Sequence, residues 1–464
     1  METRREVDPL GEKSVPKEAY YGIQTLRAVE NFPVSGLKAS ALFVKSYAQV
    51  KRAAAKANME LGCLDRAIGQ AIIKACDEAL AGKLLDQFVV DVFQAGAGTS
   101  FNMNVNEVLA NRALELMGKE KGDYRSVSPN DHVNMGQSTN DTFPTALHVA
   151  VLMALQPLEK ELNKLAEAFE DLALKNANVA KSGRTHLQDA VPVTIGQEFG
   201  AYASALRNAR AQLIERQKSL CEVALGGTAT GTGANAHPKY KRMAVAELAK
   251  ATGFPLKPAQ NSFEALQSCR AVQSVSSGLK ELALELIRIA NDLRLLASGP
   301  TTGLAEVELP AVQPGSSIMP GKVNPVMAEC LDMVAFQVVG NDLAVSLAVQ
   351  AGQLELNVMT PVIMYNVLFS IQLLTNYLPV FRERCVKGIQ VDKERCIMYL
   401  EKNPSLATFL SPYIGYLEAS KIAKQALEQN RSVKEVALER GVLTKEELER
   451  IFGSKSLFGK KRSP

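Results

Sequence analysis

The sequence predicts an all-α protein, because large apolar residues follow a helical period over most of its length. They recur at alternating spacings of three and four between residues 155 and 172 and again between residues 272 and 296. Such a stripe places one face of a long helix against its neighbours, as in a bundle or a coiled coil. Strand-like alternation is scarce. The one plausible extended stretch, residues 191–195, contains Pro192, which excludes a central strand position.

Shorter helices are predicted near the C-terminus. Residues 432–440 are periodic and are followed by Gly441, a residue type that often ends a helix. Thr444 stands three residues before Glu447, which is the spacing of a capping box at a helix start. We therefore expect one short helix before Gly441 and another that ends near Phe452.

The length and composition are those of an ordinary multidomain globular protein. The 464 residues are 47% hydrophobic and 22% charged, with a formal net charge of +4. We expect an N-terminal helical domain at 1–138, a central long-helix bundle domain at 139–390 and a small C-terminal helical domain at 391–464. The near-balanced charge argues against a dedicated binder of polyanions such as nucleic acids. The basic residues at 460–462 are interpreted as a solvated tail, with nucleic-acid contact as the alternative.

The seven cysteines are scattered, odd in number and never spaced as C-x-x-C. This pattern is typical of free thiols in a reducing compartment rather than of disulfides or a zinc site. The first residues lack an apolar signal-peptide core, so a cytoplasmic protein is expected. The four histidines also lack metal-ligand spacing, and no metal site is predicted.

One uncharged segment, residues 356–381, is long enough to span a bilayer. It nevertheless carries asparagine, glutamine and proline residues that are unfavourable in lipid. A helix with no charge on any face can instead be buried all round by other helices. We predict such a buried helix rather than a membrane span, which is the alternative, and expect its packing to involve other subunits.

Four polar, turn-rich stretches interrupt the helical pattern, at residues 96–104, 137–141, 183–189 and 314–325. Function concentrates on such loops when a rigid scaffold holds them. Together they supply hydroxyl and amide donors plus one lysine, a set that suits a small dicarboxylate better than an apolar ligand. The glycine-rich stretch 226–233 has no strand before it, so a tight turn between helices is preferred over a phosphate cradle.

Residues 315–325, Gly-Ser-Ser-Ile-Met-Pro-Gly-Lys-Val-Asn-Pro, resemble the signature of the aspartase/fumarase superfamily. The Lys-Val-Asn-Pro ending is closer to its aspartase and class II fumarase branches than to its argininosuccinate and adenylosuccinate lyases. The resemblance extends from Ala19 to Phe452 and includes the other three polar loops in the expected order. It implies a homotetramer with a shared helical core, active sites built from loops of three subunits, and reversible elimination to fumarate without a metal or organic cofactor.

Removing a proton next to a carboxylate produces an aci-carboxylate with two negative charges on one group, which requires several preorganised donors. By resemblance, Ser316 is the general base, and Lys322 stabilises the carboxylate where charge develops. His186 would lie near the reacting centre, oriented by Glu329. The donors that would bind the two carboxylates and the departing group are Thr99, Ser138, Thr139, Asn140, Thr185, Ser317 and Asn324. The alternatives are a capping role for the hydroxyls, a turn role for Ser316 and a packing role for His186.

Short segments decide between the aspartase and class II fumarase branches. The segments that resemble aspartase are 98–100, 138–140, 351–359 and 432–436. In addition, Ser128 stands where class II fumarases usually carry a histidine of a second dicarboxylate site. The segments that resemble fumarase are 226–229, 237–240 and 261–266, none of which holds a group placed on the substrate. We predict elimination of ammonia from L-aspartate, with L-malate dehydration and an inactive scaffold of the same fold as alternatives.

One position departs from both branches. Thr301, within Gly-Pro-Thr-Thr-Gly at 299–303, stands where both branches usually carry arginine. If that arginine supports the Ser316 loop, we expect loop order or activity to differ in this protein.

Overall fold

The computed structural model describes residues 2–453, which are mostly helical, as predicted. Met1 and residues 454–464, which include the basic stretch at 460–462, lie outside the described residues. Contacts divide the chain into two compact units: the first contains residues 1–159, 211–283 and 335–375, and the second contains residues 160–210, 284–334 and 376–464. The three-domain division of the sequence stays a prediction.

Five long helices contribute residues to both units: α5 (Thr139–Lys175), α6 (Ile195–Arg216), α9 (Arg270–Leu296), α10 (Val326–Gln350) and α11 (Thr360–Arg384). The apolar stripes predicted at 155–172 and 272–296 lie on α5 and α9, and every residue of the two stripes is buried. The prediction of long packed helices is therefore confirmed.

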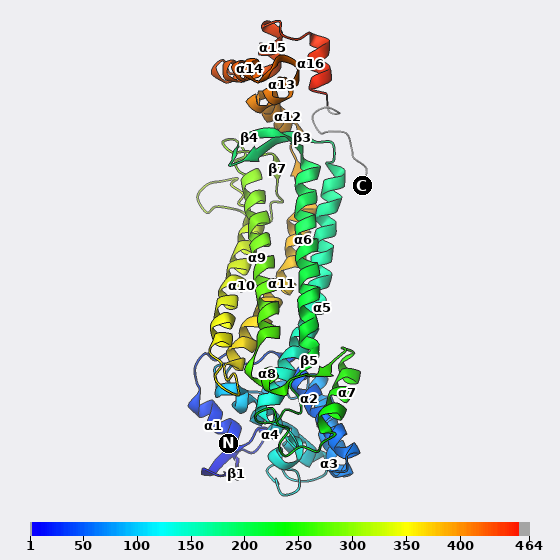
Figure 1. The fold of residues 1–464 in the computed structure, drawn as a ribbon. Helices are drawn as coiled ribbons and strands as arrows, with labels where there is room; N and C mark the ends of the chain where they lie inside the picture. The colour runs from blue at the N-terminus through cyan, green and yellow to red at the C-terminus, as the bar shows by residue number, and fades with distance from the viewer. Residues whose placement is uncertain (1, 454–464) are drawn as a thin grey trace. The chain divides into compact units, whose positions relative to one another are not determined.

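In the second unit, segments of these five helices pack side by side (Figure 1). Each helix is joined to the next by a side-chain contact, and the contacts close a ring: Phe169–Tyr202, Tyr202–Asp292, Arg294–Asp332, Met327–Tyr377 and Glu161–Arg382. The parts of the apolar stripes of α5 and α9 that lie in the second unit are buried, as expected of side chains packed between neighbouring helices.

The first unit contains the helices α1 (Ile23–Asn31), α2 (Ala41–Glu60), α3 (Arg66–Leu80), α4 (Thr99–Leu116), α7 (Tyr240–Thr252) and α8 (Ser262–Gln267). A buried aromatic cluster of Phe43, Tyr47, Phe101 and Phe143 joins α2, α4 and α5, with ring centroids 5.0–6.5 Å apart. Gly98 enters α4 with a φ of +82°, and a Cβ there would lie 2.2 Å from the Phe143 ring. Only glycine therefore fits at this helix start.

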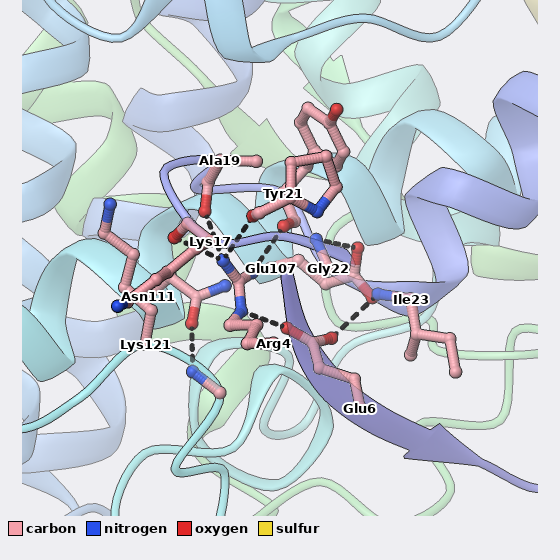
Figure 2. A network of polar contacts seen from close by, with 12 residues as sticks. Arg4, Glu6, Lys17, Ala19, Tyr21, Gly22, Ile23, Glu107, Asn111 and Lys121 are labelled. Atoms are coloured by element: carbon pink, nitrogen blue, oxygen red, sulfur yellow. Dashed lines mark hydrogen bonds and ion pairs between the residues drawn. The ribbon is translucent and has the colours of Figure 1, made fainter. Parts of the chain in front are cut away.

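An N-terminal hairpin that the sequence analysis did not predict is formed by β1 (Thr3–Asp8) and β2 (Gly11–Pro16). Figure 2 shows the Arg4 guanidinium donating to the carbonyl oxygens of Ala19 and Tyr21, at 2.7 and 2.8 Å. The buried Glu107 carboxylate accepts from the backbone N–H of Gly22 at the start of α1, at 2.8 Å. Ion-dipole contacts of this kind hold a segment that has little apolar surface of its own.

The other described strands are short. The hairpin of β3 (Ala180–Thr185) and β4 (Gln188–Thr194) contains the extended stretch predicted around Pro192. The remaining pairs are β5 (Glu222–Val223) with β6 (Lys257–Pro258) and β7 (Val307–Glu308) with β8 (Gln390–Val391).

Short helices form the C-terminal part of the second unit: α12 (Lys393–Lys402), α13 (Ser411–Ile414), α14 (Tyr416–Glu428), α15 (Val433–Glu439) and α16 (Lys445–Ile451). The capping box predicted between Thr444 and Glu447 is present at the start of α16. Gly441 follows α15 with a φ of +66°, as expected of a residue that ends a helix.

The uncharged segment 356–381 forms most of α11, and its apolar side chains are buried or half-buried except for Val358, Met359 and Val380. Gln372, Asn376 and Val380 on α11 are exposed in the single chain, so burial of this stripe by other subunits stays a prediction. By length and composition, one described helix, α10, could cross a membrane, a test that helices in protein cores also pass.

Candidate active site

The first unit presents predicted donors at the starts of two helices. Thr99 is the first residue of α4 and is exposed, with its hydroxyl 3.4 Å from the carbonyl oxygen of Gly96. Thr139 is the first residue of α5, directly after Ser138. The first N–H groups of a helix lack intrahelical partners and carry partial positive charge, so both helix starts favour an anionic group.

Ser138 and Asn140 are held by hydrogen bonds at the start of α5. The Ser138 hydroxyl accepts from the Asn140 N–H at 3.2 Å, and the Asn140 side chain donates to the Ala229 carbonyl at 2.7 Å. The capping alternative for Ser138 is therefore realised in the structure, and it leaves the hydroxyl proton available for a ligand oxygen.

The glycine-rich stretch 226–233 wraps the carboxylate of Asp141. One Asp141 oxygen accepts from the N–H groups of Gly226 and Thr228, both at 2.9 Å. Burial raises the pKa of Asp141 to about 6, while these hydrogen bonds act in the opposite direction. The prediction of a tight turn between helices is wrong, because the stretch belongs to a longer loop between β5 and α7 that is shaped around this carboxylate.

Thr139 is buried, and a polar network that the sequence analysis missed lies behind it. Its hydroxyl accepts from the Asn102 side chain at 2.9 Å, and Asn102 also donates to Asn134 at 3.3 Å. The ammonium of Lys51, which is 0% exposed, donates to the side-chain oxygens of Asn134 and Gln137 at 2.9 Å each. Burial lowers the pKa of Lys51 to about 7. A connected chain of hydrogen bonds therefore links a buried lysine to a predicted substrate ligand.

A sequence signal for Lys51 exists in α2. Tyr47, Ala48, Ala54 and Ala55 lie three or four residues away from Lys51 and are buried. Helical spacing therefore places Lys51 on the apolar face of α2, where an unpaired lysine is rare.

In the second unit, Thr185 and His186 lie at the tip of the β3–β4 hairpin. His186 and Leu187 form its two-residue connection, with φ values of +55° and +58°. Positive φ at both positions is typical of a type I′ turn, which usually takes asparagine or glycine. Both side chains are exposed in the single chain. Because histidine and leucine are unfavourable in this conformation, the strained turn is a candidate functional position.

Ser316 lies in a loop that is closed by its own backbone. The Ser316 hydroxyl accepts from the N–H groups of Ile318 and Met319, at 3.2 and 3.0 Å. The loop is closed where the Gly315 N–H donates to the Lys322 carbonyl at 2.8 Å, and a Cβ on Gly315 would lie 2.5 Å from that oxygen. The two N–H groups supply the positive potential that an alkoxide at Ser316 requires.

Lys322 and Asn324 are adjacent donors at the end of this loop. The Lys322 ammonium lies 2.8 Å from the Asn324 side-chain oxygen, and the Asn324 amide donates to the Gly315 carbonyl at 2.7 Å. Ser317 and Lys322 are exposed. Glu329 lies in the first turn of α10, and no hydrogen bond joins it to His186 among residues 2–453. The pairing of His186 with Glu329 stays a prediction.

Each unit thus holds a part of the predicted residue set. The first unit contains Thr99, Ser138, Thr139 and Asn140, which are carboxylate-binding candidates. The second unit contains the base and charge-stabilising candidates with their neighbours: Thr185, His186, Ser316, Ser317, Lys322, Asn324 and Glu329. Among the described residues, no group of three or more His, Cys, Asp or Glu side chains is arranged to hold a metal ion.

Comparison with known proteins places this geometry in a family. Residues 11–340 match the model of a family described as lyase, and residues 406–459 match that of the fumarase C C-terminus. The chain belongs to the lyase/fumarase C family. The superfamily resemblance of the 315–325 motif and the predicted fold class are thereby confirmed.

Members of the lyase/fumarase C family resemble this chain over nearly its whole length. It is 51% identical to an aspartate ammonia-lyase from Bacillus sp, over 97% of this chain and 96% of the relative. It is 49% identical to the aspartate ammonia-lyase of Escherichia coli K12, over 98% and 96% of the two chains. A solved class II fumarase from Schistosoma mansoni superposes with a TM-score of 0.95 at 39% identity, over 98% of each chain.

Proposed function

We propose that the protein is an aspartate ammonia-lyase, a carbon-nitrogen lyase that reversibly eliminates ammonia from L-aspartate in the anti sense to give fumarate. The observation that carries this proposal is the near-full-length identity of 49–51% to aspartate ammonia-lyases. The identity to the class II fumarase structure is lower, at 39%. The loop geometry at Ser316 and Lys322 supports the same chemistry.

Ser316 takes the C3 proton of aspartate. Its hydroxyl oxygen already accepts from two backbone N–H groups, so the alkoxide form is stabilised before substrate arrives. The developing aci-carboxylate needs a full positive charge, and Lys322 is the ammonium nearest to the base along the loop. Asn324 fixes the Lys322 ammonium at 2.8 Å. The aci-carboxylate then collapses, with loss of ammonia from C2.

The remaining donors bind the carboxylates and the departing amine. Thr99, Ser138, Thr139 and Asn140 are supplied by helix starts that favour anions. Thr185 and His186 are presented at a hairpin tip, and Ser317 on the Ser316 loop. His186, oriented by Glu329, acts near the reacting centre. No metal or organic cofactor takes part in this scheme.

The proposed assembly is a homotetramer with active sites shared by three subunits. Its support is an apolar face on α10, where Met333, Phe336, Leu343 and Leu347 are 57–63% exposed. Phe336 and Leu343 are seven residues apart, and Met333 and Leu347 are fourteen apart. This heptad spacing is typical of a helix that packs against another helix. All seven cysteines are free, which supports a cytoplasmic location.

Fumarate hydratase is the second candidate, supported by the class II fumarase superposition. Against it, Ser128 stands where those fumarases usually carry histidine, and its hydroxyl caps residues 129–133 by accepting from the Asp131 N–H at 3.0 Å.

The reverse reaction distinguishes an aspartate ammonia-lyase from a fumarate hydratase. Purified protein with fumarate and ammonium should produce L-aspartate, detected by proton NMR. Formation of malate, with no aspartate, would replace the proposal with the hydratase.

A further inference from the structure

Helix α12 touches both segments that carry the proposed catalytic groups of the second unit. The Tyr399 hydroxyl donates to the Gly303 carbonyl at 3.2 Å, and the Arg184 guanidinium lies 5.8 Å from the centre of the Tyr399 ring. That distance is within the range of a cation–π contact. Arg184 directly precedes Thr185 and His186, and Gly303 lies on the chain that leads into the Ser316 loop.

The two ends of this contact are rigid. Arg184 is fixed by a bidentate pair with the buried Glu306, at 2.8 and 2.9 Å. Gly303 occupies a turn in which a Cβ would lie 2.4 Å from the Ser298 carbonyl oxygen. Because neither end is free to adjust, a displacement of Tyr399 is transmitted to both segments.

Other contacts of α12 and the residue that follows it act on the same two segments. The Arg395 guanidinium donates to the Pro300 carbonyl at 3.1 Å, next to Thr301. Asn403 donates to the Ser182 hydroxyl at 3.0 Å and to the Ala190 carbonyl at 2.7 Å, both in the β3–β4 hairpin. The hairpin and the segment 300–303, upstream of the Ser316 loop, are therefore fastened to α12 and Asn403.

We propose that Tyr399 is a positioning residue. It fixes the position of the hairpin that bears Thr185 and His186 with respect to the loop that bears Ser316. This inference rests on the proposed ammonia-lyase function and adds that the C-terminal helices control the geometry of the base. Tyr399 acts through Arg184 and Gly303 and has no contact with substrate in this scheme.

The test compares Tyr399→Phe, Tyr399→Leu and Tyr413→Phe in the full-length enzyme. The first variant keeps the ring over Arg184 and loses only the hydroxyl, and the second loses both contacts. Tyr413 on α13 is 55% exposed and serves as the matched control. For each variant, kcat and KM for L-aspartate, the thermal midpoint and the rate of trypsin cleavage after Lys322 are measured.

We expect Tyr399→Phe to lower kcat about 3- to 10-fold, the loss that one hydrogen bond supports, with KM changed less than about twofold. Cleavage after Lys322 should accelerate, because the chain that leads into the loop is released from α12 at Gly303. Tyr399→Leu should show larger changes in the same direction, and Tyr413→Phe should match the wild type.

The proposal is overturned if Tyr399→Phe retains the wild-type kcat and cleavage rate. A loss of activity that only follows a lowered thermal midpoint also contradicts it, because that result indicates a general stabilising role. If the wild-type protein does not eliminate ammonia, the proposed function fails. The cleavage rate after Lys322 then still decides whether Tyr399 holds the loop.

Discussion

Arg184 and Glu306 form a bidentate ion pair, with nitrogen–oxygen distances of 2.8 and 2.9 Å, between the β3–β4 hairpin and the chain that leads to the Ser316 loop. The Glu306 carboxylate is 0% exposed and also lies 2.9 Å from the buried ammonium of Lys181. One carboxylate thus neutralises two cations from the same strand.

We expect Glu306→Gln to lower the free energy of unfolding by about 3 kcal/mol, because it removes the buried carboxylate that pairs with Arg184 and leaves Lys181 with the Glu198 carboxylate, at 3.0 Å, as its counter-charge. Urea unfolding measures the change. Glu428→Gln, on a solvent-exposed pair with Lys424, is the matched control and should change the free energy by less than about 1 kcal/mol. Equal stability of the two variants would contradict the structural role of Glu306.

Ser316→Ala should abolish most of the elimination activity. Loss of a positioned general base typically lowers the rate by about 10²- to 10⁴-fold, and the backbone donors that hold the serine remain in place. Steady-state kinetics with L-aspartate measure the effect, with Ser420→Ala on α14 as the control. A Ser316→Ala enzyme with near wild-type kcat would remove the serine from the role of base.

Lys51→Met should weaken substrate binding, although the Lys51 side chain is buried behind Thr139 and does not contact the substrate in the proposed site. The side-chain oxygens of Asn134 and Gln137 lose their shared donor, so the Asn102–Thr139 contact is no longer fixed. We expect KM for L-aspartate to rise about 10-fold, in line with the value of a hydrogen bond to a charged group, with a smaller change in kcat. Lys45→Met on the same helix is the control. An unchanged KM would show that the network does not position Thr139.

The sequence predicted the elements that a local pattern encodes. The stripes on α5 and α9 follow from helical period, and Thr444 with Glu447 follows from capping chemistry. The N-terminal hairpin escaped prediction because Arg4 holds it through carbonyl contacts with residues about fifteen positions away, which no local pattern encodes. Lys51 escaped because a lysine is assumed to be exposed until its helix face is considered.

At the site, the sequence motifs located the loops but not their internal geometry. The capture of the Ser316 hydroxyl by two N–H groups depends on the backbone path between Gly315 and Lys322. The supporting residues Glu306 and Tyr399 lie far along the chain from the hairpin they hold, so only tertiary packing brings them to it.

Acidification should destabilise the protein through His148. The imidazole Nδ1–H donates to the carbonyl oxygens of Leu220 and Glu222, at 3.1 and 3.0 Å, and burial lowers the pKa of His148 to about 4. Between the ordinary histidine pKa of about 6.5 and 4, the unfolded chain binds a proton that the folded chain does not. The free energy of unfolding therefore falls as pH falls through this window.

The contribution of His148 should reach about 3 kcal/mol at most, from the size of the shift. His148→Asn keeps an N–H donor and removes the titration, so its unfolding free energy should vary less between pH 6.5 and 4 than that of the wild type. Parallel pH profiles of the two proteins, measured by urea unfolding, would contradict the assignment.

The apolar face of α10 should be required for assembly. Phe336→Glu combined with Leu343→Glu places two charges on side chains that are 57% and 62% exposed in the single chain. If this face packs against other subunits, the charges would be buried without partners, and the oligomer should dissociate. Light scattering measures the mass. A tetramer that persists in the double variant would place the interface elsewhere.

The proposed reaction is the elimination of ammonia from L-aspartate. Its most direct test follows the ultraviolet absorbance of fumarate with purified protein, with L-aspartate in one cuvette and L-malate in another. We predict an absorbance rise with L-aspartate alone, reversed when ammonium is added. A rise with L-malate alone would contradict it and assign the protein to hydration chemistry.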